Sequence, residues 1–371
     1  MDVSVISRHD AGTGIQRVVR AILKQMLLTP PEDFVVHTVA ATRNQPYRYI
    51  SWGGCLAGCL NGRQVEAEAG DVFLGLDFSA YTIYRHRGQL VAWKKAGVKI
   101  AFLLHDLLPE NHPEWFSPFA VIRYRHWIRE LVVLSDIVFC NSGATEEEFR
   151  SFLTERFQLR DDEIATCVLP MGWDIGQAKW MDGSGSQGDI QLTRQLEGQK
   201  IVLMVGTIEP RKGYEQALLA FEQLWVAGHN HILVLVGRPG WKTGALQQRI
   251  RQSKYLGNLL YWFDHASDEQ LIALYKECDG VLIASFGEGF GLPLVEALSL
   301  GKPVLVRRLK VFEESARGGF VRFFSGESPL MLANELLAWL ESLGNLAVPA
   351  FFGPSMRDWG SAARKIVGRI A

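Results

Sequence analysis

Several features of exported or membrane-spanning proteins are missing from this sequence. Its 371 residues contain no run of roughly 18 or more apolar residues, so no membrane-spanning helix is predicted. The opening segment carries Asp2 where a secretory signal peptide has Lys or Arg, and no long apolar stretch follows. No Asn-x-Ser/Thr glycosylation site occurs, and five cysteines are an odd number for a disulfide framework. These absences predict a soluble cytoplasmic protein with reduced thiols.

The sequence also lacks a surplus of charge of either sign. Lys and Arg number 39 against 40 Asp and Glu, for a formal net charge of −1, which argues against a dedicated nucleic-acid-binding protein. No Asp-x-Asp pair occurs, and Cys55 and Cys59 have no second pair or nearby His pair to complete a zinc site. We therefore expect no nucleic-acid partner, no bound metal and no other cofactor.

What the sequence does contain is a regular alternation of apolar runs and helix-period segments. At roughly 100–200 residues per domain, the length predicts about two domains. Near-continuous apolar strands between helices are typical of parallel sheets covered on both faces. In the first part, strands are predicted at 3–6, 34–39, 71–76, 99–104 and 136–140, and helices at 15–27, 80–96, 118–134 and 143–156.

The composition changes near residue 181, where small polar residues without periodicity begin. We predict an N-terminal domain over 1–180, a linker over 181–199 and a C-terminal domain over 200–354, followed by an amphipathic helix within 355–371. The predicted fold class is α/β, with two Rossmann-like doubly wound domains expected to face each other across a cleft. Strands of the second domain are predicted at 201–205, 232–236, 259–263, 280–284 and 303–306.

The segment 206–213, GTIEPRKG, has the composition of an anion-binding loop. It follows an apolar strand directly, and Gly206, the Pro turn and two adjacent cations precede a predicted helix. A helix N-terminus supplies free N–H groups, and Arg211 and Lys212 add positive charge. A loop with two solvated cations is the alternative, and the strand–glycine–helix context favours the anion site.

The segment 286–296, FGEGFGLPLVE, combines three glycines with two carboxylates. Glycine allows the backbone to pass close to a ligand, and a helix predicted from Leu292 directs its N-terminus to the same place. Glu288 and Glu296 are eight residues apart, or about two helical turns, so both can face one ligand. The glycine pattern alone is weak evidence, whereas its combination with the carboxylates is specific.

Two further candidates fall in the first domain. His105 and Asp106 end the apolar strand KIAFLL, where either a structural role or a ligand contact fits. Gly12 and Gly14 precede the first long helix and suit a phosphate at its N-terminus. They do not form a dinucleotide fingerprint, because Arg17 stands in the place of the third glycine, which argues against an NAD-dependent oxidoreductase.

At these motifs the chain resembles the retaining glycosyltransferases of family 4, the group 1 glycosyltransferases, and in particular mannosyltransferases of bacterial surface polysaccharides. The resemblance implies a GT-B fold, with the donor sugar nucleotide held mainly by the C-terminal domain and the last helix returning to the N-terminal domain. One departure is Arg307-Arg308, where many relatives carry small or acidic residues. The matching blocks are residues 11–23, 103–109, 206–213, 232–241 and 288–296.

The resemblance implies roles for matching side chains. Arg211 and Lys212 would hold the donor diphosphate and stabilise the leaving group in place of a metal. Glu288 would touch the donor sugar, and Glu296 would accept hydrogen bonds from ribose hydroxyls. We therefore expect Arg211, Lys212, Glu288 and His105 to be the catalytic residues.

Backbone groups and the N-terminal domain would complete the donor site. The N–H groups of Phe290, Gly291 and Leu292 would orient the sugar and the phosphate. His105 would contact the sugar near the reacting carbon, and Gly14 would close over the phosphate.

The expected reaction is sugar transfer from a nucleotide sugar, with GDP-mannose favoured, to a growing bacterial surface glycan or lipid-linked oligosaccharide. A UDP-sugar donor and a non-catalytic nucleotide-sugar-binding protein remain alternatives. Eight Lys and Arg residues and three Asp and Glu residues lie between Tyr81 and Arg129, which suits peripheral contact with the inner face of an anionic membrane. The aromatic residues expected to share this surface are Trp115, Phe116, Phe119, Tyr124 and Trp127.

Overall fold

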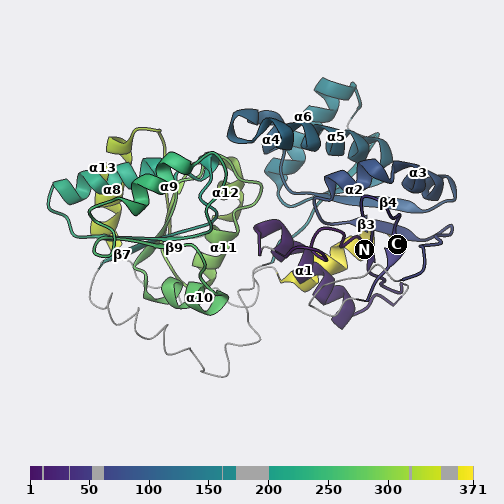
Figure 1. Cartoon of the computed structure of the whole chain (residues 1–371), viewed down its shortest axis with the longest axis horizontal. Helices are drawn as coiled ribbons and strands as arrows, with labels where there is room; N and C mark the ends of the chain where they lie inside the picture. The colour runs from purple at the N-terminus through teal and green to yellow at the C-terminus, as the bar shows by residue number, and fades with distance from the viewer. Residues whose placement is uncertain are drawn as a thin grey trace. The chain divides into compact units, whose positions relative to one another are not determined.

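The protein is described by a computed structural model and divides into two compact units (Figure 1). Unit one comprises Met1–Glu114, Pro118–Gly172 and Arg357–Ala371, and unit two comprises Trp115–Ser117 and Trp173–Met356. The predicted linker, 181–199, lies outside the described residues. The residues that the structure describes are 1–10, 12–32, 34–51, 62–160, 162–172, 200–316, 320–343 and 358–370.

Unit one is built on a parallel sheet of four strands in the order β3-β4-β5-β6, with a separate antiparallel pair, β1-β2. The strands are β1 (Val39–Ala40), β2 (Arg48–Tyr49), β3 (Val72–Gly75), β4 (Lys99–Leu104), β5 (Ile137–Cys140) and β6 (Ala165–Val168). The helices are α1 (Gly14–Leu28), α2 (Ala80–Arg85), α3 (Arg87–Lys95), α4 (Leu108–Asn111), α5 (Pro118–Leu134), α6 (Gly143–Phe157) and α14 (Trp359–Ile370), with a 3-10 turn at Pro113–Trp115.

Two strands predicted near the N-terminus are wrong. Residues 4–8 form turns rather than a strand, because the backbone N–H and Oγ of Ser4 both donate to Oδ1 of Asp2, at 2.9 and 2.5 Å. The backbone N–H of Ile6 donates to Oδ2 of Asp77 at 3.1 Å, which removes it from any strand ladder. Of the strand predicted at 34–39, only Val39 is extended in a ladder, as part of β1.

Amphipathicity explains how both ends of the chain enter unit one. The apolar positions of α1 recur every three to four residues, so one face of this helix is buried. Thr13 caps the helix, accepting a hydrogen bond from the backbone N–H of Gln16. Helix α14 also buries one face and packs against α1, although the two helices are separated by most of the sequence.

Unit two contains a parallel sheet of six strands in the order β12-β11-β10-β7-β8-β9. The strands are β7 (Ile201–Val205), β8 (Ile232–Val236), β9 (Leu260–Phe263), β10 (Gly280–Ile283), β11 (Val304–Arg307) and β12 (Val321–Phe324). The five strands predicted for this part are confirmed within one or two residues, and β12 was missed.

Helices cover both faces of this sheet, with α8, α9 and α13 on one side and α10 on the other (Figure 1). The α/β fold class predicted from the sequence is therefore confirmed. Among the residues described, no helix is long and apolar enough to span a bilayer. The helices are α8 (Tyr214–Val226), α9 (Gly244–Arg251), α10 (Asp268–Glu277), α11 (Leu292–Ser299), α12 (Lys310–Ser315) and α13 (Pro329–Ser342), with a 3-10 turn at Pro210–Lys212.

The strand order of unit two locates a ligand site. The chain passes from β7 to β8 and β9 on one side and then returns to β10, β11 and β12 on the other. The direction of winding therefore reverses between β7 and β10. In open α/β sheets, ligands bind beyond the carboxyl ends of the strands at such a switch point. The loops that follow β7 and β10 carry the two motifs found in the sequence.

Candidate active site

The loop after β7 is held tightly against the end of β10. Gly213 has a φ of +71°, and a Cβ at this position would lie 2.2 Å from the carbonyl oxygen of Ala284. Only glycine tolerates both the backbone conformation and the close approach. The backbone N–H of Phe286 donates to the carbonyl of Arg211 at 2.7 Å. The two motifs, far apart in sequence, therefore form one structural unit.

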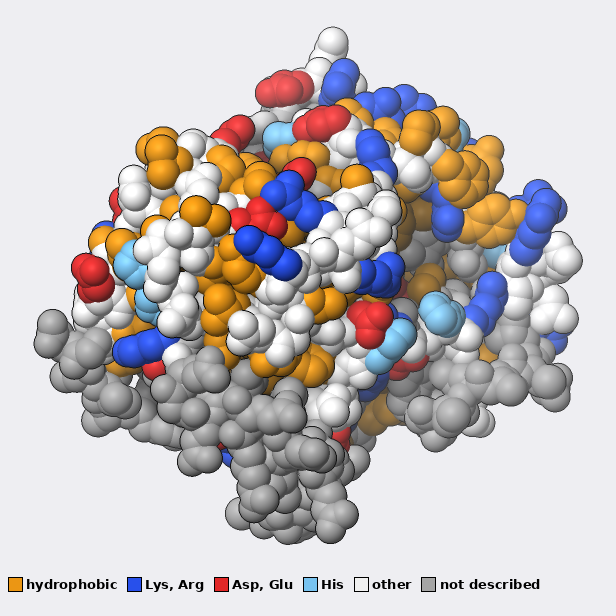
Figure 2. Space-filling model, turned by 60° about the vertical axis from the view of Figure 1, so that its left-hand side comes forward, with side chains coloured by type: hydrophobic (Ala, Val, Ile, Leu, Met, Phe, Trp, Pro, Cys, Tyr) orange, Lys and Arg blue, Asp and Glu red, His pale blue; other side chains and the backbone are white. Residues whose placement is uncertain are grey.

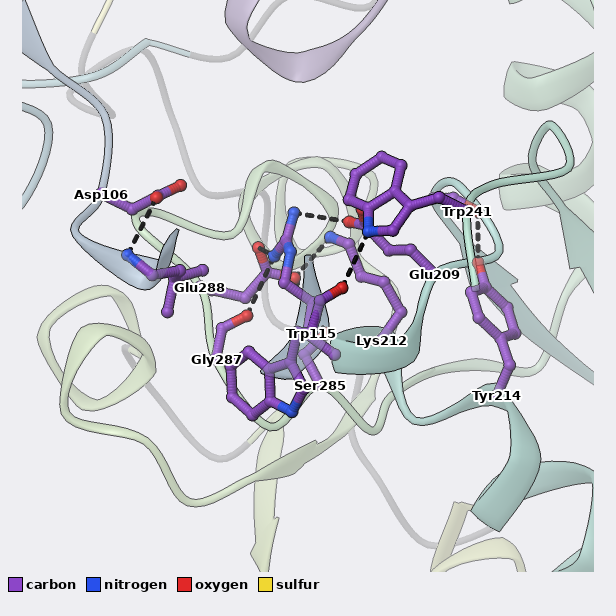
Figure 3. A network of polar contacts seen from close by, with 12 residues as sticks. Asp106, Trp115, Glu209, Lys212, Tyr214, Trp241, Ser285, Gly287 and Glu288 are labelled. Atoms are coloured by element: carbon purple, nitrogen blue, oxygen red, sulfur yellow. Dashed lines mark hydrogen bonds and ion pairs between the residues drawn. The ribbon is translucent and has the colours of Figure 1, made fainter. Parts of the chain in front are cut away.

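Lys212 and Glu288 lie next to each other (Figure 3), and together with Arg211 they form a compact ion-pair network. Oε2 of Glu288 lies 2.7 Å from Nη1 of Arg211, and its Oε1 lies 2.5 Å from Nζ of Lys212. The hydroxyl of Ser285 donates to Oε1 at 2.8 Å, and Nη1 of Arg211 also donates to the carbonyl of Gly287 at 2.9 Å. Three of the predicted catalytic residues are thus in direct contact.

A second carboxylate in the network, Glu209, was missed in the sequence. Its Oε1 lies 2.7 Å from Nη2 of Arg211, and its side chain is 3% exposed. The only signal available was its position two residues before Arg211 in a loop thought to bind anions. Together, Glu209 and Glu288 balance the charges of Arg211 and Lys212.

Glu288 is held in its ionised form. Burial by itself would raise the pKa of this carboxyl, but the attraction of Lys212 and Arg211 outweighs it and lowers the pKa to about 2. The carboxylate therefore stays charged throughout the neutral range and acts as an acceptor, not as a proton donor.

Glu296 lies deeper than Glu288, inside α11, and is 1% exposed. The hydroxyl of Tyr275 on α10 donates to its Oε2 at 2.9 Å. Tyr275 was not a candidate in the sequence, because its contact with Glu296 joins two different helices and no sequence spacing predicts such a contact. The predicted ribose contact of Glu296 stays a prediction.

The turn between the two carboxylates has the geometry expected for close backbone approach. Gly291 has a φ of +87° and is the N-cap of α11, and a Cβ there would lie 2.3 Å from Cε1 of Phe312. Phe290 is buried, and Leu292 begins the helix. The N–H groups at a helix N-terminus attract negative charge, and their role in holding a donor stays a prediction.

Gly206 directly follows β7 and supports the same loop. Its backbone N–H donates to the carbonyl of Val236 at 2.9 Å, and its carbonyl accepts from the hydroxyl of Tyr214 at 2.5 Å. Tyr214 is the first residue of α8, so this bond fixes the start of that helix relative to β7.

The remaining candidates belong to unit one. His105 follows β4 and is buried, and its Nε2 lies 2.8 Å from the carbonyl oxygen of Leu76. Burial lowers the pKa of His105 to about 4, although the bond to Leu76 opposes this shift. A neutral imidazole that donates from Nε2 keeps Nδ1 as an acceptor. His105 is therefore suited to accepting a hydrogen bond from a hydroxyl at neutral pH.

A buried carboxyl close to the end of β3 was also missed. Asp77 follows β3, one residue after Leu76, and is almost fully buried. Burial, followed by repulsion from Asp2, raises the pKa of Asp77 to about 6. Its Oδ2 accepts the backbone N–H of Ile6, as described above. Gly14, the other candidate in unit one, is exposed and begins α1.

The sequence matches a known enzyme family over this site. Residues 189–365 match the family described as "Glycosyl transferases group 1". The resemblance to the group 1 glycosyltransferases inferred from the sequence is therefore confirmed over these residues.

A curated relative extends the match to the whole chain. The chain is 31% identical over 377 residues to "Serotype-specific mannosyltransferase WbdA" of Escherichia coli. The alignment covers 100% of this chain and 46% of that protein, so the chain spans less than half of the relative's length.

Solved structures show the same architecture. The crystal structure of WaaG, described as a glycosyltransferase involved in lipopolysaccharide biosynthesis, aligns with a TM-score of 0.59 at 17% identity, covering 97% of this chain and 96% of that one. Anabaena Alr3699/HepE in complex with UDP-glucose aligns with a TM-score of 0.55 at 23% identity, covering 81% and 74%. The GT-B fold class predicted from the sequence is thereby confirmed.

Proposed function

We propose that this chain is a retaining glycosyltransferase that moves mannose from GDP-mannose to a growing bacterial surface glycan or lipid-linked oligosaccharide. The observation that carries the proposal is the ion-pair network of Arg211, Lys212 and Glu288 at the switch point of unit two. The similarity of the chain to a serotype-specific mannosyltransferase supports mannose as the transferred sugar.

The proposed chemistry follows from the charges at the network. When the bond between the anomeric carbon and the diphosphate oxygen breaks, negative charge grows on the leaving diphosphate. Arg211 and Lys212 offer fixed positive charge there, which stabilises the transition state without reorganisation. The acceptor hydroxyl would attack from the face that the diphosphate leaves, and its proton would pass to a diphosphate oxygen. This path retains the configuration at the anomeric carbon.

A thermal-shift panel of GDP, UDP, dTDP, ADP and NAD tests the donor class. A ligand that binds only the native state at about 100 times its Kd adds about 2.7 kcal/mol of stability. We expect GDP to give the largest rise in Tm. The largest rise with UDP would support the UDP-sugar alternative, suggested by the HepE complex. A rise with NAD alone would overturn the transferase proposal.

Turnover then separates an enzyme from a binding protein. We expect release of GDP from GDP-mannose in the presence of a mannose-terminated oligosaccharide, and the same rate after dialysis against EDTA. Complete loss of activity, restored by Mg²⁺ or Mn²⁺, would contradict the assignment of leaving-group stabilisation to Arg211 and Lys212. Tight GDP binding with no turnover of any donor would support the non-catalytic alternative.

We further propose that unit one contacts the membrane that carries a lipid-linked acceptor. On α5, Phe119 is 67% exposed and Ile122 is 54% exposed, while the guanidinium of Arg123 lies 5.5 Å from the Phe119 ring centroid. The expectation of an aromatic surface is wrong for Tyr124 and Trp127, which point into the core from the other face of α5. Exposed hydrophobic side chains do lie beside Lys and Arg on the molecular surface (Figure 2).

Vesicle co-sedimentation tests this contact. We expect binding to phosphatidylglycerol vesicles, weaker binding to phosphatidylcholine vesicles, and a loss with Phe119→Ser, because apolar insertion and charge attraction act together. Val226→Ser is the matched control, since Val226 is exposed on unit two. Equal binding of both variants and the unchanged protein would contradict the proposal.

A further inference from the structure

Arg307, the last residue of β11, is a buried cation behind the candidate active site. It is 6% exposed, and its guanidinium forms hydrogen bonds on three sides. Nε donates to the carbonyl of Ala284 at 3.1 Å, Nη1 to the carbonyl of Gly326 at 2.6 Å, and Nη2 to Oε1 of Gln216. Within the part of the chain that the structure describes, no carboxylate forms an ion pair with Arg307.

Two aromatic rings complete the surroundings of this guanidinium. Its central carbon lies 4.0 Å from the ring centroid of Phe286 and 4.9 Å from that of Phe324. A guanidinium stacks on aromatic faces while its edge donates hydrogen bonds, which a lysine ammonium cannot do. Glu327 attracts this charge without forming an ion pair with it. Burying a charge without an ion pair carries a desolvation cost, so stability alone does not account for an arginine at this position.

Three of the five partners of Arg307, namely Ala284, Phe286 and Gln216, belong to the two segments that carry the ion-pair network. Gln216 lies in the first turn of α8, four residues after Lys212. Ala284 and Phe286 precede Glu288 by four and two residues. The hydrogen bond between Phe286 and Arg211 already joins these two segments directly. Arg307 joins them a second time, through its hydrogen bonds to Ala284 and Gln216.

We propose that Arg307 is a positioning residue that holds the Arg211–Lys212 loop and the Glu288 loop in register. Its planar fork fixes Ala284 and Gln216 at once, and its stacking on Phe286 fixes the approach to Glu288. The inference rests on the proposed function for its effect on turnover. It does not depend on the identity of the sugar or the base.

The test compares Arg307→Lys and Arg307→Met with the same two changes at Arg308. Arg308 is the matched control, because it is exposed and pairs with Glu313 at the surface. A displacement of about 1 Å at a catalytic group can cost about 10²-fold in rate, so we expect Arg307→Met to lower kcat by about tenfold to a hundredfold. Arg307→Lys should recover little, since one ammonium cannot replace three fixed donors. The Arg308 variants should keep the unchanged kcat.

Nucleotide affinity supplies a readout that does not require turnover. If the Arg211–Lys212 loop shifts, the Arg307→Lys protein should bind GDP or UDP about threefold to tenfold more weakly, the equivalent of one net hydrogen bond. A protein without any transferase activity would fail the proposed function, and this affinity would still decide the role of Arg307. A normal kcat and a normal affinity, with only a lower Tm, would overturn the inference. Full recovery by Arg307→Lys would do the same.

Gln216→Met covers the case in which Arg307→Met does not fold. This change removes the acceptor of Nη2, together with the bonds that the Gln216 amide donates to the carbonyls of Gly326 and Ser328, and it leaves the guanidinium in place. We expect a smaller fall in kcat, and a double variant with Arg307→Lys that loses less than the product of the single effects, because both changes act through one contact. Strictly multiplicative losses would show that Arg307 and Gln216 act separately, and the inference would be wrong.

Discussion

The ammonium of Lys212 lies 2.5 Å from Oε1 of Glu288, so this cation is already paired with a carboxylate before a ligand binds. The same carboxylate contacts Arg211 through its other oxygen. A diphosphate that approaches these cations must therefore share them with Glu288. The network is preorganised, because both cations are already fixed in position by buried carboxylates.

The first prediction concerns the charge of Glu288. We expect Glu288→Gln to bind the bare nucleoside diphosphate as tightly as the unchanged protein, or more tightly, because a competing anion is removed. Turnover should fall, because Glu288 is expected to contact the donor sugar. Calorimetry with GDP and UDP, together with steady-state rates, checks both parts.

Glu313→Gln provides the control for this experiment, since Glu313 pairs with Arg308 on the surface. Because the pKa of Glu288 is lowered to about 2, its charge is constant at neutral pH, and the difference between the two proteins should not vary there. Weaker nucleotide binding by Glu288→Gln would show that the carboxylate supports the cations instead of competing with the ligand.

The second prediction separates Glu296 from Glu288. We expect Glu296→Gln to weaken binding of the bare nucleoside diphosphate by roughly 1.5–3 kcal/mol, the value of hydrogen bonds to a charged group, because a ribose hydroxyl loses its charged acceptor. Tyr275→Phe, which removes the hydroxyl that orients this carboxylate, should cause a smaller loss. Calorimetry on all three variants decides the matter. Equal losses for Glu288→Gln and Glu296→Gln would mean that the two carboxylates are misassigned.

The fold of unit two was predictable because its strands are buried on both sides. Strands such as β7 and β8 read as continuous apolar runs, and the helices between them keep a clear period. The strand predicted at 3–6 failed although three of its four residues are apolar. Asp2 and Asp77 capture the backbone and side-chain donors of this segment, and Asp77 is distant in sequence.

In the candidate site, too, some residues were predictable from the sequence and others were not. Arg211, Lys212 and Glu288 were found because each belongs to a short motif. Tyr275 was missed because its role arises only when α10 and α11 pack together. Local patterns predict which loops carry the chemistry. They do not predict the residues that orient it, since those contacts are formed by tertiary packing.

The third prediction uses the buried carboxyl of unit one. Burial and the charge of Asp2 raise the pKa of Asp77 from 3.8 to about 6, so the folded state binds more protons than the unfolded state between these values. The free energy of unfolding contributed by Asp77 therefore falls as the pH rises through this window. The full effect is about 3 kcal/mol.

Asp77→Asn removes this titration while its amide oxygen still accepts the N–H of Ile6. Relative to the unchanged protein, the variant should gain up to about 3 kcal/mol of stability between about pH 4 and pH 7. Urea unfolding at several pH values measures the difference, with Asp162→Asn as the control at an exposed position. A difference between Asp77→Asn and the unchanged protein that does not change with pH would contradict the prediction.

The last prediction concerns Arg211, whose two terminal nitrogens contact different carboxylates, Glu288 and Glu209, each at 2.7 Å. The donor diphosphate is anionic before the reaction, so either cation should help binding, but charge on the leaving oxygens grows in the transition state. Removal of one preorganised donor typically costs about 10²–10³ in turnover, and we expect that order for Arg211→Ala. Arg211→Lys should recover little, because an ammonium cannot make the two-pronged contact.

Stability must be measured on the same proteins, because Arg211→Ala removes the ion pair between Arg211 and the buried Glu209 and can cost about 3–5 kcal/mol. Tm values show whether the assay temperature leaves each variant folded. The double variant with Lys212→Ala should lose less than the product of the single losses, because both cations serve one diphosphate. A folded Arg211→Ala protein with a normal kcat and only a raised KM would assign Arg211 to uniform substrate binding, and leaving-group stabilisation would then have to come from other groups.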